Sequence, residues 1–362
     1  MKRLLIIGST CVDVILRLDH LPTTGEDMHP VQRFAMGGCA FNVAQVPKAY
    51  DVDLRFVTPI GDHGVFSDFV RAHLDNAGFR GPITVPDSEN GCCYCLVERS
   101  GERTFLSVHG VEYSFHAEYM DAFAGERFDY TYICGLEVEE KTGGELVAWL
   151  EAHPDIAGTV VYAPGPRGIE VDADRTERIL GMPPILHLNE QEAQALAGMS
   201  GNEGTQPKIP VVAPDASATV SGIQAVASTD SETAPDRAVT EAAAPSVEST
   251  ATAGRADTDA DPVLAAAQAL HAKTGNMVIV TCGADGVLWI SADGSVHSAP
   301  SVPSTVVDTI GAGDSHCGAV LTGLTLGWTE EDTMRFANQI ASEVVAQEGG
   351  AYIRRVYGVC PH

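Results

Sequence analysis

Residues 308–314 read DTIGAGD, and the ten residues that follow, SHCGAVLTGL, are mostly small or apolar. The turn Gly311–Gly313 has no bulky side chain, so its backbone N–H groups can come close to a ligand. Apolar residues then recur at helical spacing, at Cys317, Val320, Leu321 and Leu324, so we expect the turn to open a helix. A helix N-terminus offers unpaired N–H donors and a partial positive charge, which together favour a bound phosphate.

Asp314 would lie beside that phosphate. A carboxylate in this position can accept the proton of a hydroxyl that attacks a phosphoryl group. The stretch therefore points to phosphoryl transfer. The alternative is an ordinary helix entry in which Asp314 is the N-cap.

Short apolar runs alternate with helix-like stretches along the chain. The runs cover residues 3–8, 54–61, 129–135, 159–165, 184–189 and 276–283. Helix-like stretches such as 66–78 and 144–153 separate several of them. This alternation predicts an α/β fold with a mostly parallel central sheet and helices on both faces. Ligands bind at the carboxyl ends of the strands in such folds.

Two segments alternate apolar and polar residues instead, and they predict a small sheet at the edge of the main one. The first is 11–19, and the second, 91–110, reads as a hairpin with a turn at Ser100–Glu102. We expect a lid built from about 11–36 and 91–110. Both faces of the hairpin are apolar, with Cys93, Cys95 and Val97 on one and Cys92, Tyr94 and Leu96 on the other. One face would cover a ligand, and the outer face, which carries Tyr94, would pair with a second subunit in a homodimer.

Residues 200–262 differ from the rest of the chain. They are rich in Ala, Thr, Ser and Pro and have no aromatic residue, so they cannot bury enough apolar area to offset the entropy of ordering. We expect a low-complexity, disordered insertion in a single α/β domain made of 1–199 and 263–362.

Composition indicates which binding partners and which cellular location to expect. A net charge of −27 makes nucleic acid and anionic membranes poor partners. Asp13 and Arg17 interrupt the apolar run near the N-terminus, so we expect the first strand of a cytoplasmic protein, not a signal peptide. The nine cysteines cluster only in CCYC at 92–95; with no second cluster, we expect reduced thiols that act as small hydrophobic side chains.

Four motifs occur in order: GGCAFNVA at 37–44, NEQE at 189–192, TCGADG at 281–286 and DTIGAGD at 308–314. Together they resemble the signatures of the ribokinase-like (PfkB) carbohydrate kinase family, over 1–199 and 263–354. The resemblance implies a ribokinase-like fold, ATP as phosphoryl donor and a small sugar as acceptor.

The resemblance also implies roles for individual residues. Asp314 would be the catalytic base, with Gly311, Ala312 and Gly313 as the anion hole. The substrate would be bound by Asp13, Gly37, Gly38, Asn42 and Glu137. The nucleotide would be bound by Asn189, Thr281, Gly283, Gly286 and Asn338. On residue type alone, Glu137 also reads as a solvated carboxylate at a strand end, and Asn338 as a solvated side chain of a helix.

Two cation sites are implied as well. Asn189 and Glu192 would hold Mg²⁺ through water, although by spacing alone they read as a helix N-cap with its capping-box acid. A monovalent cation, K⁺, would lie near Asp308, Ile310 and Gly350. Arg354 stands where the family often has a small polar residue, which departs from the potassium pattern.

The sequence thus favours an ATP-dependent sugar kinase. Cys39 follows the Gly-Gly pair where ribokinases carry Lys, which argues against ribose. A nucleoside kinase is the first alternative, and Phe105 or Tyr113 would then supply a stacking surface for the base. A non-catalytic regulator is the second, and the intact Asp314 argues against it. Pro47 lies in a predicted helix, which it should end or kink.

Overall fold

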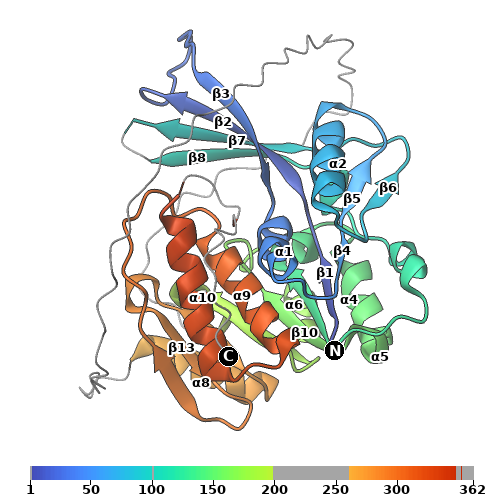
Figure 1. Cartoon of the computed structure of the whole chain (residues 1–362), viewed down its shortest axis with the longest axis vertical. Coiled ribbons are helices and arrows are strands. Elements are labelled where there is room, and N and C mark those ends of the chain that lie inside the picture. The colour runs from blue at the N-terminus through green and yellow to red at the C-terminus, as the bar shows by residue number, and fades with distance from the viewer. Residues whose placement is uncertain (1, 100–101, 199–260, 348–351, 353–362) are drawn as a thin grey trace, which may run out of the picture. The chain divides into compact units, whose positions relative to one another are not determined.

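The computed structural model describes residues 2–99, 102–198, 261–347 and 352 (Figure 1). Nearly all of the predicted insertion, 200–262, lies outside these residues, as do Gly350 and Arg354. None of the helices in the described ranges combines the length and the apolar character that a membrane span needs.

The main sheet has eight strands in the order β14–β13–β12–β11–β10–β9–β1–β4. Their bounds are β1 Leu4–Ile7, β4 Leu54–Val57, β9 Tyr130–Cys134, β10 Thr159–Ala163, β11 Ile185–Asn189, β12 Val278–Thr281, β13 Val287–Ile290 and β14 Val296–Ala299. The strands from β4 to β12 pair in parallel, and β13 and β14 form an antiparallel edge. The predicted mostly parallel sheet is confirmed.

Helices cover both faces of this sheet, as predicted. Leu4 and Ile6 of β1 point into one core and Leu5 and Ile7 into the other, which explains why the strand is apolar throughout. The first core is formed with α1 Cys39–Ala49, α2 Val65–Ala77, α9 Ala312–Leu326 and α10 Glu330–Val345. The second is formed with α4 Gly143–Ala152, α5 Pro154–Ala157, α6 Ala173–Leu180, α7 Glu190–Leu196, α8 Pro262–Thr274 and the 3-10 helix η2 Ala117–Phe123.

The predicted small sheet is also present. Its four strands lie in the order β3 Val31–Gly37, β2 Cys11–Leu18, β7 Cys92–Glu98 and β8 Arg103–Val108. β7 and β8 form the predicted antiparallel hairpin, and β2 pairs with β7 in parallel. The face that carries Val14 and Cys92 packs into the first core, where Phe34 lies edge-on to Phe66 and Phe69 of α2. Much of the face predicted to need a second subunit is therefore covered by α2 of the same chain.

The run 54–61 forms two strands, not the single strand expected. β5 (Pro59–Gly61) leaves the main sheet and pairs in parallel with β6 (Ile83–Val85). Pro59 has no N–H to donate to a ladder, so the pairing of β4 ends before it. The chain changes direction at Thr58, whose buried hydroxyl donates a hydrogen bond to the Thr10 hydroxyl.

Pro47 lies inside α1, and the helix ends soon afterwards, at Ala49. Since proline has no N–H, the Val43 carbonyl loses its usual partner one turn later. That carbonyl lies against Gly318 of α9, where an added Cβ would be 2.3 Å from the oxygen. Pro47 and Gly318 therefore allow α1 and α9 to pack backbone against backbone.

This contact gives a testable prediction. Gly318→Ala forces α1 and α9 apart, and we expect it to destabilise the protein by about 1–3 kcal/mol, the usual cost of overpacking. Gly144→Ala is the matched control, because an added Cβ there meets only the Arg175 side chain at 3.9 Å. In that helix the same change should stabilise by about 0.5–1 kcal/mol. Urea denaturation measures both, and equal stability of the two variants would contradict the packing argument.

Candidate active site

The DTIGAGD stretch forms the start of α9, as predicted. Gly311 is the N-cap, with φ of 70°, a left-handed conformation that favours glycine. Asp314 lies within the first turn of the helix, so its reading as the N-cap is wrong.

Asp314 is held by α1. The Asn42 side-chain amide donates to the Asp314 carboxylate at 2.9 Å. Loss of solvent around the carboxylate raises the pKa of Asp314 to about 6, and hydrogen bonds from Asn42 and Cys39 act in the opposite direction. Such a carboxylate is ionised at neutral pH and still basic enough to take a proton.

The Gly37-Gly38 pair, between β3 and α1, makes room for Asp13. A Cβ on Gly37 would lie 2.5 Å from the Asp13 carboxylate. Gly38 has φ of 101°, and a Cβ there would lie 2.6 Å from the Ser9 carbonyl. The pair therefore brings Asp13, on β2, to the N-terminus of the helix that carries Asn42. Burial raises the pKa of Asp13 to about 6.

Glu137 lies in the short helix α3 (Gly135–Glu139) directly after β9 and is only 2% exposed. Its reading as a solvated carboxylate is therefore wrong. One carboxylate oxygen accepts the Ser9 N–H at 2.8 Å, and burial raises the pKa of Glu137 to about 7. Its other oxygen and the Asn42 side-chain oxygen are buried with no hydrogen-bond partner among the described residues. Buried acceptors of this kind suit a ligand that brings hydroxyl groups.

A cavity of about 740 Å³ opens at the carboxyl ends of β11 and β12. Its lining includes all five residues predicted to bind nucleotide: Asn189, Thr281, Gly283, Gly286 and Asn338. Ala312 and Gly313 line it too, so the N-terminus of α9 borders this cavity. The cavity is large enough for a nucleotide-sized ligand.

Asn338 and Gly286 also shape the cavity wall. Asn338 is buried, and its amide donates to the Pro300 carbonyl at 2.8 Å, so its reading as a solvated residue is wrong. Gly286 has φ of 97°, and a Cβ there would lie 2.2 Å from the Ala299 carbonyl. Asn338 therefore ties the chain after β14 to α10, and Gly286 lets the β12–β13 turn lie close to it.

Asn189 and Glu192 form a complete capping box at the start of α7. The Asn189 side-chain oxygen accepts the Glu192 N–H at 2.8 Å, and Glu192 accepts the Asn189 N–H at 3.0 Å. The Asn189 amide donates to the second Glu192 oxygen at 2.8 Å. Burial raises the pKa of Glu192, and the nearby charge of Asp314 acts in the same direction. The two side chains are thus bonded to each other. Asn189 lines the cavity described above, and Glu192 lines a second one.

Asp308 meets a partner that the sequence did not suggest. The guanidinium of Arg103, on β8, donates to its carboxylate, which also accepts the Ile310 N–H at 2.8 Å. The residues predicted to hold K⁺ therefore include a carboxylate already facing a cation, while Gly350 lies outside the described residues. Arg103 lies in the predicted hairpin, where no ion pair with Asp308 was expected.

His316 is a second residue that sequence reasoning missed. It lies one turn into α9, lines the cavity, and is 2.9 Å from His187 of β11. Burial lowers the pKa of His316 to about 4, so the ring is neutral at physiological pH. Its position two residues after Asp314 could have suggested that it lies near the site.

Known proteins resemble this chain over nearly its whole length. The family model described as "pfkB family carbohydrate kinase" matches residues 1–231 and 244–354. A sugar kinase of Escherichia coli K12, YegV, described as uncharacterised, is 29% identical over 96% of this chain and 90% of its own length.

Solved structures share the fold at low identity. Arabidopsis thaliana ribokinase, in complex with ribose and ATP, superposes with a TM-score of 0.66 at 17% identity, covering 96% of this chain and 94% of that one. A nucleoside kinase of Burkholderia thailandensis, in complex with inosine, gives 0.65 at 16% identity, covering 96% and 92%. The predicted ribokinase-like fold is confirmed.

The raised pKa of Glu137 predicts how stability depends on pH. Its folded pKa of about 7 lies above the ordinary glutamate pKa of 4.5, so the folded state binds more protons between these values. Stability is therefore lost as pH rises through this window, by about 3 kcal/mol at 1.36 kcal/mol per pKa unit.

Glu137→Gln has no proton to lose. We expect its free energy of unfolding, relative to the unmodified protein, to rise by up to about 3 kcal/mol between pH 4 and pH 8. Urea denaturation at both pH values measures this. Glu118→Gln, at an exposed side chain, is the control and should show no such change. A pH-independent difference for Glu137→Gln would contradict the burial argument.

Proposed function

Because the chain belongs to the pfkB family of carbohydrate kinases, we propose that it transfers a phosphoryl group from ATP to a hydroxyl group of a small sugar. One observation carries the proposal. Asp314, desolvated and fixed by Asn42, lies in the first turn of α9, and that helix end borders the cavity lined by the nucleotide motifs.

This geometry supports the following reaction. Asp314 accepts the proton of the attacking sugar hydroxyl, and the oxygen attacks the γ-phosphorus of ATP. The bond between that phosphorus and the bridging oxygen breaks, and ADP leaves. The backbone N–H groups of Gly311–Gly313, at the positive end of α9, stabilise the charge on the transferring group. Fixed backbone donors also suit a strongly acidic chain, because they attract phosphate without a basic side chain.

The sugar lies between β2, α1 and α3 in this proposal. Asp13, Asn42 and the second oxygen of Glu137 accept its hydroxyl groups. The Asn42 and Glu137 oxygens have no hydrogen-bond partner among the described residues, and the Asp13 carboxylate lies against Gly37, which has no side chain. The small sheet closes over the sugar and excludes water, which would otherwise compete as the acceptor.

Magnesium fits the site through water. Both Glu192 oxygens already accept hydrogen bonds from Asn189. The pair would therefore bind the water ligands of Mg²⁺ and would not contact the ion directly. When bound, Mg²⁺ neutralises charge on the ATP phosphates. A monovalent cation at Asp308 fits poorly, because the Arg103 guanidinium already faces that carboxylate and would repel it.

Two further features belong to the proposal. Leu106 and Val108 of β8 are each 55% exposed, and we place the homodimer contact on this uncovered end of the small sheet. A nucleoside is the alternative acceptor, favoured by the likeness to the inosine-bound kinase. Phe105, 51% exposed on the Cys95 side of the sheet, would then stack on the base.

Asp314→Asn tests the catalytic base. The variant keeps an acceptor for Asn42 but cannot take a proton, so kcat should fall by roughly 10²–10⁴-fold while ATP binding and stability stay close to those of the unmodified protein. In the unmodified enzyme, kcat/KM should fall about tenfold per pH unit below pH 6, as Asp314 becomes protonated. A variant that keeps most of its kcat would remove Asp314 from the mechanism.

A panel of sugars and nucleosides, assayed for ADP release with ATP and Mg²⁺, tests the acceptor. We expect turnover of a sugar other than ribose. Phe105→Ala provides the discriminating variant. A stacked base is worth about 1–3 kcal/mol, so nucleoside turnover by this variant would lose roughly 5- to 150-fold in kcat/KM. Turnover of nucleosides alone would replace the sugar proposal, and no turnover of either class would favour the regulator.

A further inference from the structure

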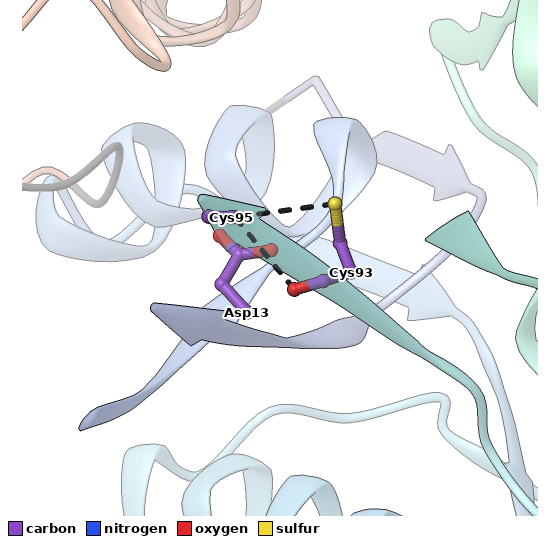
Figure 2. Close-up of side chains that lie close together, drawn as sticks. All are labelled: Asp13, Cys93 and Cys95. Atoms are coloured by element: carbon purple, nitrogen blue, oxygen red, sulfur yellow. Dashed lines mark hydrogen bonds between the residues drawn. The ribbon is translucent and has the colours of Figure 1, made fainter. Parts of the chain in front are cut away.

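The small sheet carries a cluster of metal-binding side chains. Asp13, Cys93 and Cys95 converge on one face of it (Figure 2). The parallel pairing of β2 and β7 sets Asp13 directly beside Cys93, and Cys95 lies two residues further along the same face. The ligand atoms of the three residues all lie within 4.8 Å of one another.

The two sulfurs have the spacing of metal ligands. They are 3.9 Å apart, whereas two sulfurs on one tetrahedral zinc ion, each about 2.3 Å from it, are about 3.8 Å apart. A disulfide would require about 2 Å, and both cysteines are free thiols. The side chains therefore need little movement to bind a metal ion.

We propose that Asp13, Cys93 and Cys95 form a three-ligand site for a zinc-like divalent cation, with the fourth position open. Two thiolates and one carboxylate match the ligands that zinc prefers, whereas Mg²⁺ and Ca²⁺ prefer oxygen alone. Binding replaces the two thiol protons by the metal ion and leaves the covalent structure unchanged.

Neighbouring side chains support the site. The Ser107 hydroxyl, on β8, donates to the Cys93 sulfur at 3.6 Å. This hydrogen bond would help to orient the sulfur for metal binding. The Cys11 thiol is 4.0 Å from the Asp13 carboxylate. Gly37 leaves the Asp13 carboxylate uncrowded, which keeps the third ligand free to turn towards the sulfurs.

Zinc at this site should oppose the sugar. This consequence rests on the proposed function, in which Asp13 accepts sugar hydroxyls. A metal ion bound by Asp13 removes that acceptor and occupies the face that covers the sugar. Zinc should then raise KM for the sugar and leave KM for ATP unchanged.

Direct binding tests the site itself. The full chain, kept reduced, is titrated with Zn²⁺ against a chromophoric chelator, and with Co²⁺ to detect thiolate-to-cobalt charge-transfer absorption. We expect one site whose affinity falls at least tenfold in Cys93→Ser/Cys95→Ser, together with loss of the cobalt band. Cys92→Ala is the matched control, because the Cys92 side chain lies on the opposite face of β7 and packs in the core. This variant should bind zinc as the unmodified chain does.

The outcomes separate the two proposals. Equal zinc affinity of the unmodified chain and the double variant would overturn the metal site and leave the kinase proposal untouched. Cysteine-dependent zinc binding establishes the site, and a rise in sugar KM that disappears in the double variant supports Asp13 as a shared ligand. Cysteine-dependent binding without that rise would keep the metal site but remove Asp13 from sugar binding.

Discussion

The structure depends on the close contact of α1 with α9, where the Val43 carbonyl lies against Gly318. This contact brings the N-terminal turn of α9, with Asp314, to the first turns of α1, with Asn42. The hydrogen bond between these two side chains then fixes the carboxylate at 2.9 Å from its donor. A larger residue at Gly318 would separate the helices and lengthen that bond, so a packing constraint in the core decides the geometry of the site.

The buried carboxylates of the site have unfavourable electrostatics that a ligand would relieve. Burial raises the pKa of Asp13 and Asp314 to about 6 and that of Glu137 to about 7, so each carboxylate costs stability when it is ionised. Under the proposed function, this cost arises where the sugar hydroxyl groups and the phosphoryl donor would bind. Backbone N–H groups at the start of α9 supply the opposing positive potential without adding a basic side chain to the site.

The small sheet has two different faces, and each has its own task. One face packs on α2 and continues the core. The other presents Asp13 beside two thiols, and Arg103 at the end of the hairpin reaches Asp308 just before α9. Movement of this sheet would therefore change the surroundings of the Asp13 carboxylate and of the turn before α9 together.

The sequence alone determined the features that depend on neighbouring residues. Apolar runs and helical spacing predicted the parallel sheet, the hairpin of β7 and β8 and the start of α9, because strand and helix periods are local. The order of four motifs identified the family. The division of 54–61 was missed although Pro59 was visible, because the loss of one donor matters only once a neighbouring strand is known.

Only the tertiary structure decided which distant residues meet. Asn42 and Asp314 are 272 positions apart, and Arg103 and Asp308 are 205 apart. The pairing of β2 with β7 placed Asp13 close to Cys93 and Cys95, which the sequence had suggested only as small hydrophobic side chains. Such contacts follow from the packing of helices and the register of strands, which depend on the whole core and cannot be inferred from a short stretch of sequence.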